Sequence, residues 1–394
     1  MTDITSPLLD FCRSQSAWVR QTVETLVALE SPSDDKTAVD RCGAELTRQL
    51  TAIGGHVARS AQTTCGDHIF AEWRTTDTIK SESAPILVLG HFDTVWPTGT
   101  LNRMPLHERD GRLYGPGIFD MKAGIAAAML AMRALIERHA APAHVVMLWT
   151  TDEEIGSGTS RSLIEEIART SSAVLVLEPS LPHGAAKTSR KGVGEFEVVV
   201  HGIAAHAGLD PGKGASAIHE LARQVLALEA LQEPDRGITI NVGVISGGSR
   251  TNVIADRASA AIDVRVQTME DAARLEGAIR SLRPTRSSLR LEVSGGIGRP
   301  PLERSPAVVR LYEEARLVAA TLGRDLREGA AGGGSDGNFT GALGVPTLDG
   351  LGPEGDGAHA VHEYVVLDDL SWRGAFLAGL IESLARSSTS AVQR

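Results

Sequence analysis

The sequence predicts an α/β protein in which a larger domain, with a mostly parallel sheet and helices on both faces, is interrupted by an inserted ferredoxin-like α+β domain. Three observations carry this prediction. Apolar runs typical of buried strands alternate with helical segments in the first half of the chain. The pattern changes near residue 190 to alternating polar and apolar residues. The α/β alternation returns after the Gly/Pro-rich stretch Gly295–Pro301.

In the first half, short apolar runs predict strands that are buried on both faces. These runs are Pro85–Gly90, His144–Thr150 and Ala173–Leu177. Helical periodicity predicts a helix at Met121–His139, and a second helix is expected at Thr159–Arg169. Strands that alternate with helices in this way indicate a parallel sheet.

The inserted segment reads β-α-β-β-α-β, which is the ferredoxin-like order. The expected strands are Glu195–His201, Ile238–Ile245, Ala258–Val266 and Ser288–Val293, and the expected helices are Ala215–Leu231 and Glu270–Leu282. The sheet would have open edges, which favours pairing or helix packing with a second copy of the chain.

The last part of the chain returns to the larger domain. Its expected elements are helices at Pro306–Leu322, Ser335–Leu343 and Leu367–Ala385, a strand at Val345–Leu348 and a glycine-rich segment at Gly329–Gly334. We therefore expect one discontinuous domain over residues 1–189 and 304–394, and an inserted domain over residues 190–303.

Composition limits the classes of function. The chain has 394 residues, 42% hydrophobic and 22% charged, which is typical of a globular protein of two domains. The formal net charge of −10 argues against nucleic-acid or anionic-membrane partners. The cysteines show no CxxC spacing, so by themselves they predict buried thiols rather than disulfides or a thiolate metal site. No signal peptide or membrane-spanning run is evident, and we expect a cytoplasmic protein.

Ionisable side chains follow several of the predicted strands. His91 and Asp93 come at the end of the first strand, where the carboxylate can fix the tautomer of a metal-binding imidazole. Glu153 and Glu154 follow the next strand, and adjacent glutamates can divide the roles of metal ligand and base. Asp120 follows a glycine-rich turn, where it could also be a helix cap.

Glu178 follows the third strand, and His359 lies in a further histidine-rich segment. Each residue alone has a simpler reading as a solvated loop side chain. However, the carboxyl ends of parallel strands meet at one edge of a sheet, so we expect these side chains to gather there. Carboxylate and imidazole ligands without thiolate suit zinc, and less specifically manganese or cobalt. A pair of metals would share one bridging carboxylate.

Seven motifs make the sequence recognisable over nearly its whole length. They are GHFDTV at 90–95, GPGIFDMK at 115–122, TDEEIGSGTSR at 151–161, LEP at 177–179, AAHAGLDPGKGASA at 204–217, GGGSD at 332–336 and GAHAVHEYV at 357–365. With them the chain resembles the M20 family of metallopeptidases and deacylases, and most nearly its glutamate carboxypeptidase (carboxypeptidase G2-like) branch. The resemblance implies a catalytic domain with two zinc ions per chain, which Co²⁺ or Mn²⁺ could replace, and a lid domain through which the chain forms a homodimer.

The resemblance also implies roles by position. His91 and Glu178 would bind one zinc, Glu154 and His359 the other, and Asp120 would bridge the two. Asp93 would orient His91, and Glu153 would be the general base. His362 competes with His359, but the family places its ligand four residues before the glutamate of EYV, which selects His359.

In the lid, His206 matches a histidine that stabilises the oxyanion in the other subunit. Asn252 and Arg265 match positions that contact the carboxylate end of the substrate, and Arg299 matches an arginine that pairs with the substrate carboxylate. Gly333 and Gly334 match a glycine loop that lines the pocket.

Three departures bear on the substrate. Met121 stands where the carboxypeptidase G2 type has a second aspartate, and DMK is more usual among the deacylases. The lysine near the substrate in that branch has no clean counterpart, and the signal peptide of periplasmic members is missing. Glu178, by contrast, resembles the carboxypeptidase and deacylase branches more than the aminopeptidases.

The leading hypothesis is a zinc-dependent hydrolase of an amide bond that releases a C-terminal amino acid, glutamate or a similar carboxylate-bearing residue, from a peptide or small N-acyl conjugate. The first alternative is an N-acyl-amino-acid deacylase or desuccinylase. A non-catalytic dimeric binding protein is a second alternative, which the filled ligand and base positions disfavour.

Overall fold

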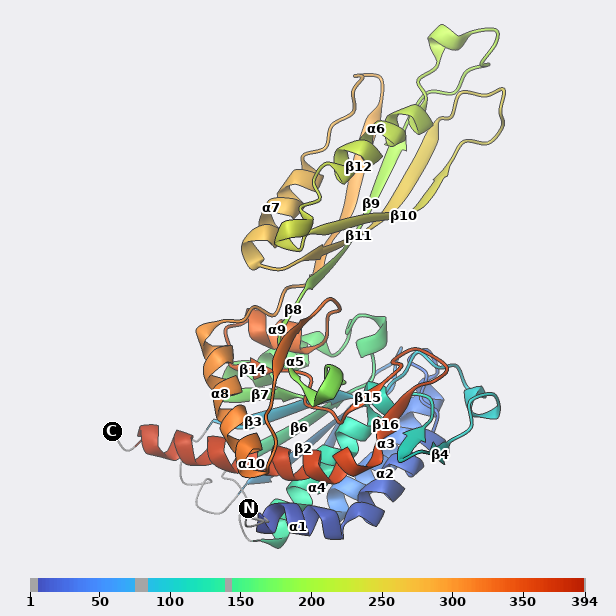
Figure 1. Cartoon of the computed structure of the whole chain (residues 1–394). Helices are drawn as coiled ribbons and strands as arrows, with labels where there is room; N and C mark the ends of the chain where they lie inside the picture. The colour runs from blue at the N-terminus through green and yellow to red at the C-terminus, as the bar shows by residue number, and fades with distance from the viewer. Residues whose placement is uncertain (1–5, 75–83, 139–143, 393–394) are drawn as a thin grey trace. The chain divides into compact units, whose positions relative to one another are not determined.

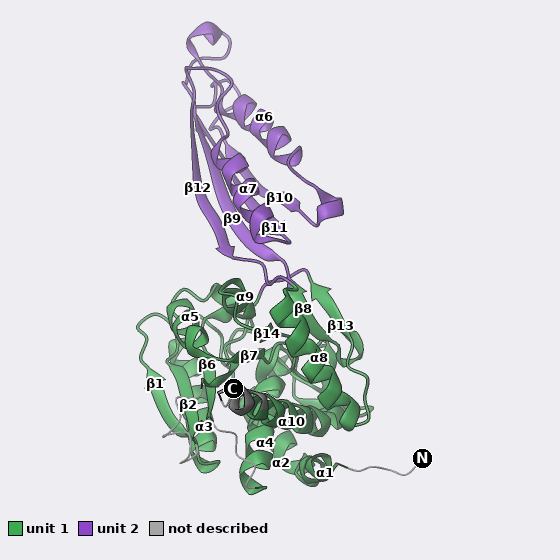
Figure 2. Cartoon of the chain, turned by 90° about the vertical axis from the view of Figure 1, so that its left-hand side faces the viewer, with its two compact units in different colours: residues 1–189, 304–331, 335–394 green, residues 190–303, 332–334 purple. Residues whose placement is uncertain are grey.

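The computed structural model describes residues 6–74, 84–138 and 144–392, and divides them between two compact units. Unit 1 comprises residues 1–189, 304–331 and 335–394, and unit 2 comprises residues 190–303 and 332–334 (Figure 2). Within the described residues, none of the helices has the length and hydropathy needed to cross a membrane.

The centre of unit 1 is a six-stranded sheet with the order β1-β2-β6-β3-β7-β14 (Figure 1). The strands are β1 (His56–Ser60), β2 (His68–Arg74), β6 (His144–Thr150), β3 (Ile86–His91), β7 (Ala173–Val176) and β14 (Thr347–Leu348). The last four in this order run parallel, whereas β1 and β2 pair antiparallel. The carboxyl ends of β6, β3 and β7 therefore share one edge.

Helices cover both faces of this sheet because its strand residues alternate between two apolar clusters. Ile86 and Val88 of β3 belong to the larger cluster, and Leu87 and Leu89 belong to the smaller one on the other face. The larger cluster includes residues of α1 (Pro7–Ser14), α2 (Ser16–Ala28), α3 (Lys36–Ala52), α4 (Ala123–Glu137), α8 (Pro306–Thr321) and α10 (Leu367–Val392). The smaller cluster includes residues of α5 (Arg161–Thr170) and α9 (Gly337–Ala342).

Two smaller sheets complete unit 1. One has the order β15-β16-β5-β4 and the other pairs β13 with β8. Their strands are β15 (Gly355–Asp356), β16 (Tyr364–Val366), β5 (Arg112–Tyr114), β4 (His107–Arg109), β13 (Glu328–Ala331) and β8 (Ala186–Arg190). The first of these sheets places the segment after β15 against the segment after β5, because β16 pairs with β5.

Unit 2 is a four-stranded antiparallel sheet with two helices packed on one face (Figure 2). Along the chain its elements are β9 (Gly192–His201), α6 (Ala217–Glu229), β10 (Thr239–Gly247), β11 (Arg257–Val266), α7 (Met269–Arg280) and β12 (Arg290–Arg299). The spatial order β10-β11-β9-β12 is that of a split β-α-β unit. The predicted fold class is therefore confirmed.

The structure corrects several element boundaries. No element is predicted before Pro85, yet α1, α2, α3, β1 and β2 lie there. Helix α4 begins at Ala123 because Ile118–Lys122 forms a separate irregular turn, and the predicted helix end at His139 lies outside the described residues. Strand β12 was expected to end at Val293 but continues to Arg299.

Glycine allows that continuation of β12. Gly295 has a φ of +91°, and a Cβ built there would lie 2.1 Å from the carbonyl oxygen of Glu195 on the neighbouring strand. Only a residue without a side chain fits so close to the backbone of β9. A glycine-rich stretch that looked like a linker is thus part of the sheet.

Candidate metal centre

Three neighbouring strands of unit 1 deliver ionisable side chains to one edge of the sheet. His91 is the last residue of β3, Glu153 and Glu154 form the turn that follows β6, and Glu178 lies two residues after β7. Because β6, β3 and β7 are parallel neighbours, these four side chains come to the same edge.

Asp120 lies between two histidines. Its Oδ1 is 3.2 Å from Nε2 of His91, and its Oδ2 is 3.4 Å from Nε2 of His359. The carboxylate thus offers one oxygen to each imidazole. This is the arrangement that a carboxylate bridging two cations requires.

A further carboxylate lies beside each of these two histidines. Glu178 Oε1 lies 3.5 Å from Nε2 of His91, and Glu154 Oε2 lies 3.2 Å from Nε2 of His359. Donor atoms of His91, Glu153 and Glu178 lie within 4.8 Å of one another, as do those of His91, Asp120 and Glu154. The structure thus brings together all five predicted ligands and the predicted base. His362 is exposed, and it is His359 that faces Asp120 and Glu154.

The electrostatics of this cluster favour positive charge between the carboxylates. Hydrogen bonds to Asp120 and Glu154 raise the pKa of His359 to about 10. Burial opposes the protonation of His91, but hydrogen bonds to Asp120, Asp93 and Glu178 raise its pKa well above the ordinary value. Burial raises the pKa of Glu154, because the buried carboxylate lacks enough compensating partners.

One atom of the cluster lacks a partner. Oε1 of Glu154 is buried and accepts no hydrogen bond from any residue that the structure describes. A buried carboxylate oxygen without a partner is costly, and a bound cation would remove that cost. Carboxylates and imidazoles without thiolate form a donor set that fits divalent cations such as zinc.

Asp93 holds both His91 and the glutamate turn in place. The Nδ1 of His91 lies 3.1 Å from the backbone oxygen of Asp93 and 3.4 Å from its Oδ1. The same carboxylate accepts the backbone N–H groups of Glu153 and Glu154 at 3.4 and 3.3 Å, and the hydroxyl of Ser33 at 2.7 Å. Asp93 therefore orients a ligand and positions the turn that carries the predicted base.

Glu363 is a positioning residue that the sequence reasoning missed. Its fully buried carboxylate accepts the backbone N–H groups of Gly117, Phe119 and Asp120 at 2.9 to 3.1 Å, and the indole N–H of Trp96 at 2.9 Å. The side chain thus clamps the turn that presents Asp120. The sequence contains this residue as the glutamate of the GAHAVHEYV motif, but the motif was used only to choose His359, four residues earlier, as the predicted ligand.

Asp336, in the GGGSD motif, supports the glutamate turn from the other side. Its Oδ1 accepts the hydroxyl of Ser157 at 2.5 Å, and its Oδ2 accepts the hydroxyl of Thr150 at 3.2 Å. Thr150 ends β6 and Ser157 follows the glutamates, so Asp336 ties together the two ends of that segment. Its contribution depends on a contact across the chain that no local pattern reveals.

The candidate residues of unit 2 form two groups at opposite ends of its sheet. His206 lies in the loop after β9 and Asn252 in the loop before β11, and the Ala207 N–H donates to the Asn252 carbonyl at 3.0 Å. Arg265 of β11 and Arg299 of β12 both pair with Val193, the second residue of β9, from the two sides of that strand. His201 ends β9 on the His206 side, eight residues from Val193.

The arginine end also contains the glycine loop. A Cβ built on Gly334 would lie 3.0 Å from Cδ of Arg299, and the buried guanidinium of Arg190 donates to the carbonyls of Gly333 and Gly334. The guanidinium of Arg265 forms two parallel hydrogen bonds with Asp263 at 2.9 and 2.8 Å.

Comparison with known proteins identifies the family. The model of peptidase family M20/M25/M40 matches residues 87–383. The chain belongs to this family. As a member of this peptidase family, the chain is a hydrolase. The M20 family is metal-dependent, and the candidate metal ligands of this chain are the residues around Asp120.

Curated relatives of this M20 protein include proteins named as a carboxypeptidase and as desuccinylases. Carboxypeptidase G2 of Pseudomonas sp. (strain RS-16) is 30% identical over 382 residues, which cover 93% of this chain and 89% of that protein. Succinyl-diaminopimelate desuccinylase of Xanthomonas oryzae pv. oryzae (strain PXO99A) is 30% identical over 324 residues, which cover 76% of this chain and 84% of that protein.

Solved structures share the M20 fold at lower identity. Aminopeptidase PepT of Bacillus cereus aligns with a TM-score of 0.78 and 22% identity, over 94% of this chain and 99% of that chain. The YXEP protein of Bacillus subtilis, described as a dinuclear metal-binding peptidase of the M20 family, aligns with a TM-score of 0.66 and 16% identity, over 94% of this chain and 98% of that chain.

Proposed function

We propose that this M20 protein is a hydrolase with two zinc ions that cleaves an amide bond and releases a C-terminal amino acid with a carboxylate-bearing side chain, such as glutamate. The observation that carries the proposal is the Asp120 carboxylate, which offers one oxygen to His91 and the other to His359. The relative named carboxypeptidase G2 and the neighbour described as a dinuclear metal-binding peptidase support it.

The ligand roles follow the two sides of Asp120. His91 and Glu178 would hold one cation and Glu154 and His359 the other, with Co²⁺ or Mn²⁺ as substitutes for zinc. Two divalent ions bound there would acidify a water molecule and polarise the carbonyl of the scissile amide.

Glu153 is the residue proposed to move the proton. It precedes the ligand Glu154, and its backbone N–H donates to Asp93, so the position of its backbone is fixed from the same carboxylate that orients His91. As general base Glu153 would take a proton from the attacking water at a carboxylate oxygen, and would return it to the departing amine.

Arg299 is the proposed partner of the substrate carboxylate. It packs against Gly334, whose missing side chain leaves room for the Arg299 side chain itself. A guanidinium binds a carboxylate through two parallel hydrogen bonds. The family resemblance gives Arg299 the pairing with the substrate carboxylate. We therefore assign the specificity for acidic products to Arg299, and to Arg265 and Asn252 a contact with the carboxylate end of the substrate.

His206 is proposed as the donor to the oxyanion. Its Nδ1 accepts the backbone N–H groups of Gly208 and Leu209, both at 3.1 Å, which places the proton of the neutral ring on Nε2. The ring is therefore held as a hydrogen-bond donor at its exposed side. That is the tautomer that stabilisation of a developing negative charge requires.

The arrangement inside unit 2 supports a homodimer. The eight residues of β9 between Val193 and His201 span roughly 26 Å at about 3.3 Å per residue, so one sheet holds His206 and Arg299 far apart. If both contact one small substrate, they must come from two chains. The edge strand β10 exposes Val244 and Ile245, which suits pairing with a second copy.

A comparison of substrates tests the proposal. Peptides and N-acyl conjugates that end in glutamate or aspartate are compared with their glutamine and asparagine counterparts, with added zinc and with a chelator. We expect chelator-sensitive hydrolysis with higher kcat/KM for the acidic products, and loss of that preference in Arg299→Ala. Hydrolysis that a chelator leaves undiminished, in protein free of metal, would contradict the proposal.

The same assay tests the second candidate, an N-acyl-amino-acid deacylase or desuccinylase. The Asp120–Met121 sequence and the relatives named desuccinylase favour it. Faster cleavage of N-succinyl amino acids, with no preference for an acidic released residue, would select this alternative. The cytoplasmic location stays a prediction.

A further inference from the structure

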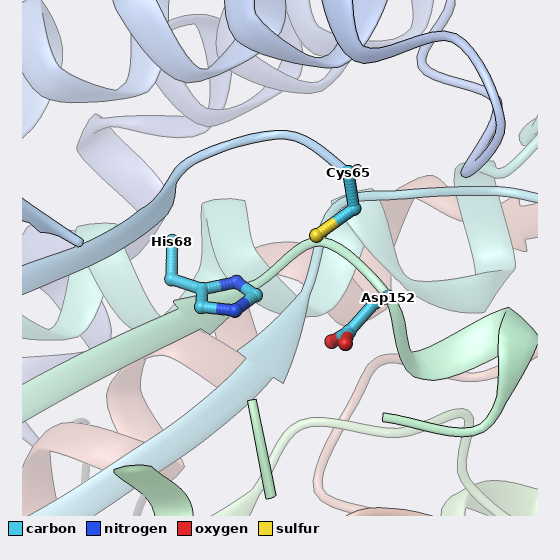
Figure 3. A group of neighbouring side chains, drawn as sticks. All are labelled: Cys65, His68 and Asp152. Atoms are coloured by element: carbon cyan, nitrogen blue, oxygen red, sulfur yellow. The ribbon is translucent and has the colours of Figure 1, made fainter. Parts of the chain in front are cut away.

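A second group of metal-binding side chains lies in unit 1, apart from the ligands around Asp120. Cys65 lies just before β2, His68 is its first residue, and Asp152 follows β6, the neighbour of β2 in the sheet. All three are at least 99% buried, and their donor atoms lie within 4.8 Å of one another. Figure 3 shows the thiol, the imidazole and the carboxylate turned toward one another.

Nε2 is the nitrogen of His68 that faces the group. Nδ1 lies 2.9 Å from the hydroxyl oxygen of Thr151, and that hydroxyl donates to the carbonyl of Gly66 at 2.5 Å. With a cation bound at Nε2, the neutral ring would carry its proton on Nδ1, where the oxygen of Thr151 can accept it. Metal-binding histidines are held in this way, with the other nitrogen donating to an oxygen.

Nε2 of His68 lies beside the hydroxyl group that the other two donors also contact. The hydroxyl oxygen of Thr159 lies 2.9 Å from Nε2 of His68, 3.2 Å from Sγ of Cys65 and 2.8 Å from Oδ2 of Asp152. An imidazole nitrogen, a thiol sulfur and a carboxylate oxygen thus surround one hydroxyl group.

Asp152 supplies an independent sign of a ligand. Its Oδ2 accepts the backbone N–H groups of Thr159 and Ser160 at 2.7 and 3.3 Å. Its Oδ1 is buried and has no hydrogen-bond partner among residues 6–74, 84–138 and 144–392. An unpartnered carboxylate oxygen in a residue that is 1% exposed costs stability unless something binds it.

We propose that Cys65, His68 and Asp152 form an additional cation site that binds zinc through a thiolate, an imidazole and a carboxylate. On binding, Cys65 releases its proton to solvent and its sulfur bonds to the cation, and Nε2 of His68 and a carboxylate oxygen of Asp152 donate the other two pairs. A water molecule or the Thr159 hydroxyl takes the fourth position. A soft thiolate selects zinc or cobalt over magnesium and calcium. This site does not depend on the proposed function.

The other cysteines have surroundings that differ from those of Cys65. Burial raises the pKa of the Cys12 thiol to about 12, and burial likewise raises the pKa of Cys42. Both lie in the apolar core of unit 1, in α1 and α3. They should stay protonated, which makes Cys12 a control for the assignment of a thiolate ligand to Cys65.

Cobalt spectroscopy tests the site without any assay of turnover. The full chain is freed of metal with a chelator and titrated with Co²⁺. The ligands around Asp120 contain no sulfur, so a thiolate-to-cobalt charge-transfer band in the near ultraviolet reports Cys65 alone. Because the two proposed sites around Asp120 also take Co²⁺, we expect that band to reach its full height by three Co²⁺ per chain, with the intensity of a single cobalt–thiolate bond, and to disappear when Zn²⁺ is added in excess.

Variants decide which side chains carry the band. Cys65→Ser should abolish it, Cys12→Ser should keep it, and His68→Asn should raise the cobalt concentration needed for half saturation. Thr151→Val, which removes the acceptor of the Nδ1 proton, should weaken cobalt binding roughly 10–100-fold. Because Cys65→Ser could lower stability, circular dichroism confirms that each variant is folded. A cobalt-loaded wild type without the band, or a band that persists in folded Cys65→Ser, overturns the proposal.

Discussion

At the scale of single residues, the adjacent glutamates provide the sharpest separation of roles. Glu154 lies 3.2 Å from His359 and is the proposed ligand, whereas Glu153 is the proposed base. Glu153→Gln should therefore lower kcat by about 10²–10⁴-fold with little loss of bound metal. Glu154→Gln should lose metal first, as measured by elemental analysis of the purified variants. The reverse pattern of metal loss would show that the two roles are exchanged.

Glu363 leads to a second prediction at this scale. Glu363→Ala leaves the N–H groups of Gly117, Phe119, Asp120 and Trp96 without their acceptor, and each unsatisfied buried donor costs about 1–3 kcal/mol. We expect a lower unfolding temperature and weaker metal binding, because the turn that presents Asp120 is no longer held. His362→Ala, at the exposed neighbour, is the matched control and should change neither quantity. Equal effects of the two variants would rule out the clamp.

How far the site could be predicted depends on where each residue lies relative to a strand. His91, Glu154 and Glu178 follow the ends of parallel neighbours, so a strand prediction was enough to bring them together. The Glu363 carboxylate meets backbone N–H groups more than 240 residues away, and no local pattern encodes that contact. The roles assigned from the family resemblance stay predictions.

At the scale of elements, a buried ion pair ties the first turn of α10 to the rest of unit 1. Asp369 accepts the Glu354 N–H at 2.6 Å and lies 3.3 Å from the fully buried guanidinium of Arg373, and Arg324 pairs with its other oxygen. Burial opposes ionisation of Asp369, but the charges of Arg373 and Arg324 hold its pKa below the ordinary value. The ionised carboxylate therefore stabilises the folded chain.

The sign of the pH dependence follows from that depressed pKa. The stabilisation is complete above the unfolded pKa of about 3.9 and is lost as the pH falls through the lower folded value. Asp369→Asn should lower the free energy of unfolding by about 3–5 kcal/mol at pH 7, since it leaves Arg373 buried without its partner. In urea unfolding, the difference in the free energy of unfolding between wild type and Asp369→Asn should become smaller below about pH 4. Asp368→Asn, at an exposed neighbour, should show no such gap.

Elements with a clear hydrophobic pattern were predictable from the sequence, and elements whose position depends on pairing with another strand were not. The strands around His91 are continuous apolar runs, and the inserted β-α-β-β-α-β order was legible from alternation alone. Strand β12 was cut short because Gly295 resembles a linker residue, although its place is set by the backbone of β9. Strand β1 has mostly exposed residues, so it lacks the apolar signal and is defined by its pairing with β2.

At the scale of the whole molecule, the question is whether one chain contains a complete site. His206 and Arg299 lie at opposite ends of the sheet of unit 2, with roughly 26 Å of β9 between their levels. Arg299 lies beside Gly334, one residue before the chain returns to unit 1 at Ser335. The family resemblance assigns His206 to the active site of the other subunit. We therefore expect His206 to act on the substrate of the partner, and Arg299, at the far end of the sheet, on the substrate of its own chain.

Mixing experiments test this division. His206→Ala should lose about 10²–10³-fold in kcat as an oxyanion donor is removed, and Glu153→Ala should be nearly inactive. In a hybrid of the two, one site combines an intact Glu153 with an intact His206 from the other chain. Random exchange makes half of the dimers hybrids, so the mixture should regain about a quarter of wild-type activity.

Arg299→Ala mixed with Glu153→Ala is the control. Each site of that hybrid lacks one residue of its own chain, so activity on acidic substrates should stay low. If native mass spectrometry shows subunit exchange and the mixture of His206→Ala with Glu153→Ala regains no activity, His206 does not act across the dimer, and the separation of His206 from Arg299 must have another explanation.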